Sequence, residues 1–282
     1  MTGKPLGILA AGGTLPGELA KKVVKNGRDI FVVGIDGVAS DELREFPHAF
    51  VSIGQIGRIF SSFEKAGCRE LVVIGRFDRP DLSAIKLDAT AVMNAPRLRR
   101  ILKGGDDAVL TGVFKFLEDK GFQVLGIHDV APSMLAGGAE IQTRNATSDE
   151  LEDITAGFSA LRGMSEFDIG QSLVVINGRI VAVEAAEGTD AMLQRVGELR
   201  KTGRIPRKSG NGILVKTAKH GQDLRADIPV IGTETLNNIN AAGLTGLAVE
   251  AGRVIIAQVE QFSAALKTHK LAFHIEPSNG DR

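Results

Sequence analysis

The sequence of 282 residues contains one cysteine and neither tryptophan nor tyrosine. Cys68 alone cannot form an internal disulfide, and a single cysteine excludes a multi-cysteine zinc or iron–sulfur site. A site that stacks a base or a sugar would have to use phenylalanine, arginine or aliphatic side chains. A covalent tyrosine intermediate is impossible.

Long apolar runs and an excess of charge are also missing. No stretch approaches the ~20 apolar residues that span a bilayer, and the N-terminus lacks the basic region and cleavage pattern of a signal peptide. Lys plus Arg number 34 and Asp plus Glu number 34, so the formal net charge is zero. This balance argues against a general nucleic-acid binder. We therefore expect a cytoplasmic protein without a nucleic-acid partner.

What the first part of the chain does have is a regular alternation of buried strands and amphipathic helices. Apolar runs at 6–11, 30–35, 49–53, 71–74 and 122–127 predict strands, and the stretches 16–25, 56–65 and 108–120 predict helices. Such alternation implies right-handed crossovers and a parallel sheet covered on both faces. The sequence predicts an α/β protein whose residues 1–133 form a Rossmann-like domain.

Residues 134–164 differ in composition and are interpreted as a linker that contains one helix. Small and polar residues dominate up to Asn145, and a helix is expected from Asp149 to about Arg162. Thr147 or Ser148 would cap it, with Glu150 in support.

The remainder, 165–282, predicts a separate α+β domain. Asn177-Gly178 between two apolar runs is a strong hairpin signal and favours a type I′ turn. A second hairpin-like pair is expected around Ala251-Gly252. Helices are expected at 190–199, 234–242 and 259–269, and further strands at 213–216 and 271–275.

Two segments of the first domain could bind a phosphate or a sugar. Gly12-Gly13-Thr14 follows the first strand and precedes a helix, where free backbone N–H groups favour an anion. The turn lacks the G-x-G-x-x-G pattern, so a tight strand-to-helix turn is the alternative interpretation. Arg79, in a loop with Arg76 after a later strand, could clamp a phosphate. The alternative there is a solvated loop of mutual ion pairs.

Carboxylates gather in the second domain, in VEAAEGTDAM. Glu187 and Asp190 fall at a strand-to-helix turn, where they would repel each other unless a cation is present. Mg²⁺ prefers oxygen ligands and is the simplest candidate. Thr189 or Asp190 could instead cap the helix.

The densest signal is the segment 216–232, KTAKHGQDLRADIPVIG. It carries the cations Lys216, Lys219 and Arg225 together with two aspartates, Asp223 and Asp227, between apolar strands. This mixture suits a polyphosphate held by cations and a metal, with water as the nucleophile. An exposed loop of mutual ion pairs is the alternative.

Taken in order, several motifs resemble one family. They are AAGGTLPGELA, RPDLS, GDDAVL, GIHDV, DIGQS, VEAAEGTDAM, QDLRADIPVIG and VEAGR, and they span almost the whole chain. This set resembles the UDP-2,3-diacylglucosamine pyrophosphatase family of lipid A biosynthesis, which is unrelated to the calcineurin-like metallophosphoesterases. The chain departs from the family pattern at Ala11, where a further glycine is expected, and at His220, where proline is expected.

The resemblance implies Mg²⁺-dependent hydrolysis of UDP-2,3-diacylglucosamine to UMP and 2,3-diacylglucosamine 1-phosphate (lipid X), with water attacking the α-phosphorus. Asp227 matches the family's essential aspartate. With Glu187 or Asp190 it would hold the metal, and it could serve as ligand or as general base. Lys216, Lys219 and Arg225 would neutralise the diphosphate. The expected substrate-binding residues are Gly12, Gly13, Thr14, Arg79, Asp168, Gln171 and Thr189.

The same resemblance implies a homodimer in which the substrate lies between two domains. Because each buried CH₂ contributes ~0.8 kcal/mol, the acyl chains would dominate affinity. We therefore expect peripheral contact with the cytoplasmic face of the inner membrane. The alternatives are an enzyme of a soluble sugar nucleotide, which would act on a non-acylated UDP-sugar, and a non-catalytic nucleotide-binding regulator, which would bind UDP without hydrolysis.

Overall fold

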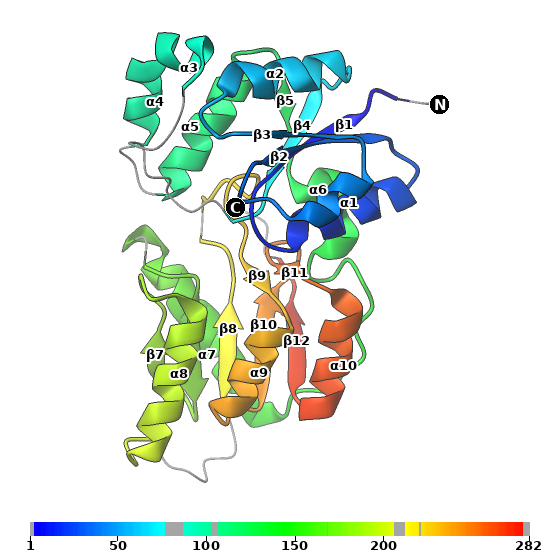
Figure 1. The fold of residues 1–282 in the computed structure, drawn as a ribbon. Coiled ribbons are helices and arrows are strands. Elements are labelled where there is room, and N and C mark those ends of the chain that lie inside the picture. Colours follow the sequence, from blue (N-terminus) through cyan, green and yellow to red (C-terminus); the bar gives the residue numbers. More distant parts are fainter. Residues whose placement is uncertain are drawn as a thin grey trace. The chain divides into compact units, whose positions relative to one another are not determined.

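The computed structural model describes residues 3–76, 87–102, 106–167, 169–205, 212–219 and 221–278. The chain divides into two compact units. Unit 1 consists of residues 1–131 and 225–227, and unit 2 of residues 132–224 and 228–282. Each unit is built on its own sheet (Figure 1).

Among its described residues, unit 1 contains the strands and the three helices that its alternating apolar pattern predicts. It also contains three helices, at 89–93, 95–101 and 127–130, that the pattern does not predict. The strands are β1 (Leu6–Ala10), β2 (Ile30–Ile35), β3 (His48–Val51), β4 (Glu70–Ile74) and β5 (Gln123–Val124). The helices are α1 (Leu15–Lys25), α2 (Ile56–Lys65), α3 (Ala89–Met93), α4 (Ala95–Ile101), α5 (Asp106–Glu118) and α6 (Ile127–Val130), with the 3₁₀ turn η1 (Asp41–Glu45).

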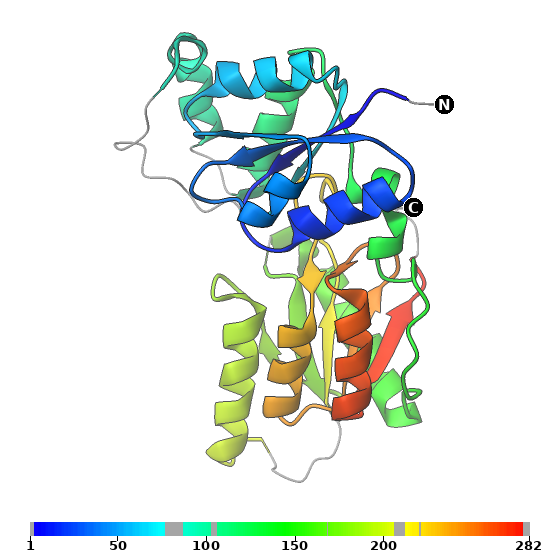
Figure 2. The same ribbon diagram turned by 45° about the vertical axis from the view of Figure 1, so that its right-hand side comes forward.

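The described strands of unit 1 form a parallel sheet in the order β3-β2-β1-β4-β5. Helices α2 and α5 cover one face and α1 covers the other (Figures 1 and 2). Phe60 and Phe63 of α2 pack with Phe114 and Phe116 of α5 against one set of strand residues. The chain reverses its direction of winding between β1 and β4, and in such sheets ligands bind at the carboxyl ends of the strands beside that point. The prediction of a Rossmann-like parallel sheet is confirmed.

Unit 2 contains the remaining elements. Its strands are β6 (Ser172–Ile176), β7 (Arg179–Val183), β8 (Ile213–Lys216), β9 (Val230–Ile231), β10 (Gly246–Glu250), β11 (Ile255–Ile256) and β12 (Ala272–Glu276). Its helices are α7 (Ser148–Met164), α8 (Gly188–Lys201), α9 (Thr233–Ala241) and α10 (Val259–His269), with the 3₁₀ turns η3 (Pro132–Met134) and η4 (Ser165–Phe167).

The main sheet of unit 2 is mixed, with the order β12-β10-β8-β6-β7. Strands β8, β10 and β12 are parallel to one another, whereas β6 runs antiparallel to β7 and β8. Alternate strand residues face two cores: Val175 and Val215 pack under α7, and Val174 and Leu214 pack with the residues of α8, α9 and α10. Helix α7 lies within the segment 134–164 that the sequence suggests as a linker, and its Ile154, Phe158 and Leu161 belong to one of these cores.

The first hairpin of unit 2 is confirmed, because Asn177 and Gly178 have φ values of 50° and 73°, as a type I′ turn requires. Asp153 of α7 accepts hydrogen bonds from both of these backbone N–H groups, at 3.0 and 2.6 Å. Asp153 therefore ties the hairpin to α7.

The prediction of a second hairpin around Ala251-Gly252 is wrong. Strand β10 pairs with β8 and β12, and β11 pairs in parallel with β9 in a separate sheet. Gly252 has a φ of 71°, and its N–H donates to Ala136 O. The turn therefore leads the chain out of the main sheet instead of back along β10.

Candidate functional site

In unit 1 the glycine turn lies at the carboxyl end of β1, beside the end of β4. Gly12 and Arg76 exchange backbone hydrogen bonds at 3.1 and 2.8 Å. A Cβ atom on Gly75, whose φ is +107°, would lie 2.8 Å from Gly12 O, so this close approach requires glycine there. The contact closes the two strand ends against each other at the point where the sheet order reverses.

The turn presents exposed backbone to this sheet edge. Gly13 has a φ of +91° and is exposed, as is Thr14. The Thr14 hydroxyl donates to Glu18 Oε1 at 2.9 Å, and the side chain of Thr14 makes no capping hydrogen bond to α1. The first turn of α1 is thus not closed by its own N-cap side chain, which suits an anionic ligand.

The predicted catalytic aspartate also belongs to unit 1, because residues 225–227 are assigned to it by their contacts. Arg225 Nη1 donates to Glu118 Oε1 at 2.9 Å and to Val124 O at 3.3 Å. The Arg225 guanidinium lies 5.6 Å from the centre of the Phe114 ring, and Ala226 packs against the α2–α5 core. These contacts hold the backbone next to Asp227 at the carboxyl end of β5.

The GIHDV motif forms the surface against which this segment lies. A Cβ atom on Gly126 would lie 3.2 Å from Arg225 Cγ and within 2.5 Å of two His128 ring atoms. Asp129 Oδ2 accepts from the Gly126 N–H at 2.9 Å, which fixes the turn after β5. Glycine at position 126 therefore leaves room for Arg225.

In unit 2, a buried lysine ends β8. Lys216 is 7% exposed, and its Nζ donates to Thr189 Oγ1, near the start of α8, at 2.6 Å. Burying an ammonium group is costly unless polar partners surround it. The structure thus brings together two predicted site residues that lie far apart in the sequence.

The loop after β8 is fixed by hydrogen bonds from three directions. Gln222 Oε1 accepts from the Lys219 N–H at 3.0 Å and from Gln171 Nε2 at 3.4 Å. Arg253 Nη2 donates to Lys219 O at 2.9 Å. Because the Thr217 N–H donates to Gln171 O at 3.0 Å, the predicted residues Gln171 and Lys219 lie beside the end of β8 that carries Lys216.

Two hydroxyl–carboxylate pairs flank Lys216 at this sheet edge. Ser172 Oγ donates to Glu184 Oε2, and Thr217 Oγ1 donates to Glu250 Oε2, both at 2.6 Å. Ser172 and Thr217 are buried. A buried lysine, buried hydroxyls and carboxylates at the carboxyl end of parallel strands form a site that can bind phosphate oxygens and sugar hydroxyls.

The predicted metal ligands are divided between the two units. Glu187 and Asp190 lie in unit 2 and Asp227 in unit 1. Glu187 Oε1 accepts from Arg195 Nη2 at 3.0 Å, and Asp190 Oδ1 accepts from Asn238 Nδ2 at 2.8 Å. Within the described part of the chain, no group of three or more His, Cys, Asp or Glu residues is placed to hold a metal ion. Arg79 and Asp168 lie outside the described residues.

Sequence reasoning did not single out Glu250 and Arg253 as site residues. Arg253 Nε lies 3.5 Å from Glu250 Oε2, and both residues line a cavity of about 70 Å³ next to Gln171 and Lys219. The signal was present, since these two residues are the polar positions of the VEAGR motif.

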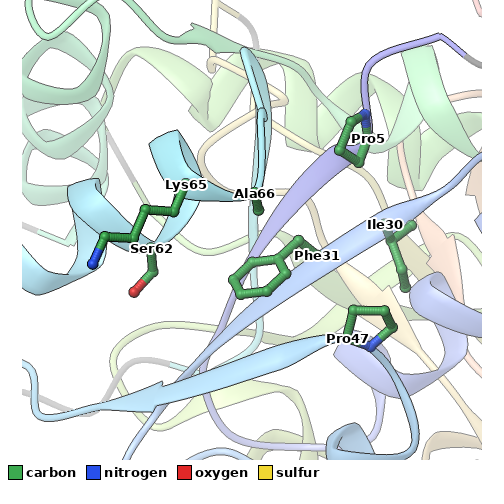
Figure 3. A pocket seen from close by; sticks show the side chains of 7 residues that line it. All are labelled: Pro5, Ile30, Phe31, Pro47, Ser62, Lys65 and Ala66. Atoms are coloured by element: carbon green, nitrogen blue, oxygen red, sulfur yellow. The ribbon is translucent and has the colours of Figure 1, made fainter.

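A larger groove of about 410 Å³ lies elsewhere in unit 1, at the amino ends of its strands (Figure 3). It is lined by Pro5, Ile30, Phe31, Pro47, Ser62, Lys65 and Ala66. Figure 3 shows Phe31 between the α2 residues on one side and the two prolines on the other. The groove is mostly apolar and lies at the opposite edge of the sheet from the glycine turn, so we place the candidate site elsewhere.

Comparison with known proteins gives two family matches and one close relative. The LpxI N-terminal domain matches residues 5–134, and the LpxI C-terminal domain matches residues 138–274. The UDP-2,3-diacylglucosamine pyrophosphatase LpxI of Caulobacter vibrioides is 36% identical over 262 residues, which cover 93% of this chain and 94% of the relative.

Among solved structures, a GalE-like L-threonine dehydrogenase from Cupriavidus necator (holo form) is similar at 10% identity. The alignment covers 98% of this chain and 86% of that one, with a TM-score of 0.32. A likeness at this level carries no argument about fold or function.

Proposed function

The chain belongs to the LpxI family, and from this premise we propose that it hydrolyses the pyrophosphate bond of UDP-2,3-diacylglucosamine. Water attacks the α-phosphorus, the bond from that phosphorus to the bridging oxygen breaks, and the products are UMP and lipid X. The observation that carries the proposal is the buried Lys216, held by Thr189 at the end of β8 among residues of several family motifs.

Each part of the site has a role that follows from its chemistry. Lys216 and Lys219 supply positive charge for the diphosphate, whose transition state gains stabilisation from fixed cations. Gln171 orients the sugar through its amide. Gly13 and Thr14 would offer backbone N–H groups at a helix N-terminus, where phosphate binds well. The Gly12 N–H already donates to Arg76 O, so Gly12 would shape the turn instead.

Arg225 has a second role besides the predicted neutralisation of charge. Because its guanidinium contacts Glu118, Val124 O and the Phe114 ring, it anchors the segment that carries Asp227. We propose that Asp227 orients the attacking water. Whether it does so as ligand or as general base, the same carboxylate is required.

Magnesium is part of this proposal. Mg²⁺ is commonly held by one or two carboxylates together with water and substrate phosphate oxygens, so the carboxylates of Asp227, Glu187 and Asp190 are suitable donors. When bound, the ion would neutralise negative charge on the phosphate oxygens. Glu187 and Asp190 would have to exchange contacts with Arg195 and Asn238 to join it.

The acylated product and substrate also imply a membrane. None of the described helices has the length and hydropathy to cross a bilayer. We propose peripheral contact with the cytoplasmic face of the inner membrane, and a homodimer as the working form. Sedimentation of the purified protein tests the dimer.

Turnover of UDP-2,3-diacylglucosamine in detergent, with Mg²⁺ or with chelator in isotopically labelled water, tests the proposal. Metal-dependent release of UMP that carries the label is the expected result. Label in lipid X would reject attack at the α-phosphorus. Full activity on a non-acylated UDP-sugar would favour an enzyme of a soluble substrate, and UDP binding without hydrolysis would favour a regulator.

The variant that tests the residue assignment is Asp227→Asn. We expect turnover to fall at least about 10³-fold, since the charge that orients water is lost, with the melting temperature kept. Asp119→Asn is a matched control, because Asp119 is an exposed carboxylate of unit 1 that pairs with Arg97. Near-normal turnover by Asp227→Asn would reject its catalytic role.

A further inference from the structure

Unit 1 exposes apolar side chains in one short stretch around α3. Met93 is 82% exposed, Val92 58% and Leu87 52%. Single exposed apolar residues are ordinary, whereas a group of neighbouring ones is a candidate interaction surface.

The stretch is held in place by the rest of unit 1. Asp88 caps α3 by accepting from the Ala91 N–H at 2.8 Å, and its second oxygen accepts from the Gly57 N–H at 2.7 Å. Ala91 is fully buried. The exposed side chains of Val92 and Met93 are therefore presented outward by an anchored helix.

The next helix adds positive charge to this surface. Arg99 and Arg100 of α4 are exposed, and neither forms an ion pair with a described residue. Arg97 is different, because it pairs with Asp119 and lies 4.8 Å from the centre of the Phe116 ring. Residues 89–102 contain no aspartate or glutamate, so the charge of Arg99 and Arg100 is not cancelled within the segment.

Packing explains why this side of α4 faces outward. Leu98 and Ile101 pack against the core formed by α2 and α5, and the close approach of Ile101 to Gly112 fixes α4 on α5. Figures 1 and 2 show α3 and α4 at one end of unit 1, beside α5. We define the α3–α4 surface by five exposed residues in these two neighbouring helices and just before them, which are Leu87, Val92, Met93, Arg99 and Arg100.

We propose that the α3–α4 surface docks the protein on a lipid bilayer that contains anionic lipids. Apolar side chains would enter the headgroup region, and the two arginines would contact the lipid phosphates. Exposed apolar residues beside basic ones have the composition of an interfacial membrane contact, in which buried apolar area and attraction to anionic lipid act together. The proposal gives the peripheral contact of the proposed function a place on the molecule, and it rests on that function only for its biological setting.

Sedimentation with vesicles tests the charge requirement without any substrate. The full-length protein should bind vesicles of phosphatidylethanolamine and phosphatidylglycerol, and bind more weakly to phosphatidylcholine or at raised salt. The variant Arg99→Gln/Arg100→Gln should bind about tenfold more weakly, and Val92→Ser/Met93→Ser should do the same. The matched control is Arg179→Gln/Ile180→Ser, which changes an exposed arginine and an isoleucine that is 41% exposed on β7 of unit 2.

A spectroscopic probe locates the contact. The chain has no tryptophan, so Met93→Trp introduces a single reporter. Its emission should shift to shorter wavelength when anionic vesicles are added, whereas the emission of Ile180→Trp should not change. Circular dichroism and melting temperature would show that each exposed-residue variant is folded.

Three results would overturn the proposal. The first is unchanged vesicle binding by both α3–α4 variants, and the second is an equal emission shift from Ile180→Trp. The third is unaltered vesicle binding with reduced turnover of a short-chain, vesicle-free substrate, which would make the surface a substrate contact. Absence of hydrolysis by the wild-type protein would reject the proposed function and leave vesicle binding as a separate result.

Discussion

Lys216 at the end of β8 donates a hydrogen bond from Nζ to Thr189 Oγ1 across 2.6 Å. The two residues lie on different elements of unit 2, and the lysine is buried while its partner stands in the first turn of α8. The threonine therefore helps to fix the direction in which the ammonium group points. This relationship gives a prediction for each partner.

Replacing Lys216 by methionine should lower kcat about 10²-fold or more, because a fixed cation that faces the developing charge is lost. Thr189→Val should lower kcat about tenfold, which corresponds to one hydrogen bond to a charged group. Turnover kinetics of both variants and of the double variant measure the coupling. Independent, multiplicative losses would show that Thr189 does not act through Lys216.

Arg253 should act by positioning the loop after β8. It donates to Lys219 O and lies beside Glu250, so Arg253→Met should raise KM several-fold as Lys219 loses its fixed place. Arg253→Lys should restore part of the loss, since one ammonium cannot reproduce both contacts of the guanidinium. Measurements of kcat and KM well below the melting temperature separate an effect on loop position from an effect on folding stability. A lower melting temperature with unchanged KM would indicate a purely structural residue.

Glu118 distinguishes the two roles of Arg225. If Arg225 anchors the segment of Asp227, Glu118→Gln should lower kcat several-fold although Glu118 is not a predicted site residue. Arg225→Met should lower it further, because contact with Val124 O and the Phe114 ring is lost as well. Steady-state kinetics of both variants test whether Arg225 anchors the segment that carries Asp227. Full activity of Glu118→Gln would assign Arg225 to the diphosphate alone.

Much of the fold was predictable because its elements are long and periodic. The strands β1, β2 and β8 and the helices α1, α2 and α10 agree closely with their apolar patterns. The pairing of strand β11 could not be predicted, because a strand of two residues is too short to show an alternating apolar pattern. A glycine turn also has the same sequence whether the chain folds back along the preceding strand or runs out of the sheet. Pairing with β9 is set by tertiary contacts that local sequence does not encode.

The site was predictable as a set of residue types but not as an arrangement. The pairing of Lys216 with Thr189 depends on how α8 packs on the sheet. The assignment of residues 225–227 to unit 1 depends on Arg225 over Phe114 and on Ala226 in the α2–α5 core. Lys216 and Thr189 lie 27 positions apart in the sequence, and Arg225 and Glu118 lie 107 apart, so composition and spacing cannot reveal such contacts.

Glu150 gives a pH dependence of stability whose sign can be worked out. Burial would raise the pKa of its carboxyl, but hydrogen bonds from Arg144, Thr245 and the Thr147 N–H, together with the charge of Arg144, lower the pKa to about 2 from the ordinary 4.5. Between these values the unfolded chain binds the proton more readily than the folded protein does, so stability is lost as the pH falls through this range. Urea unfolding should show that this group contributes about 2 kcal/mol less to the free energy of unfolding at about pH 3 than at about pH 6.

The variant Glu150→Gln should lose that part of the pH dependence of stability, whereas Glu152→Gln, at an exposed position on the same helix, should keep it. Parallel curves for the wild type and Glu150→Gln would show that other carboxyls control acid unfolding.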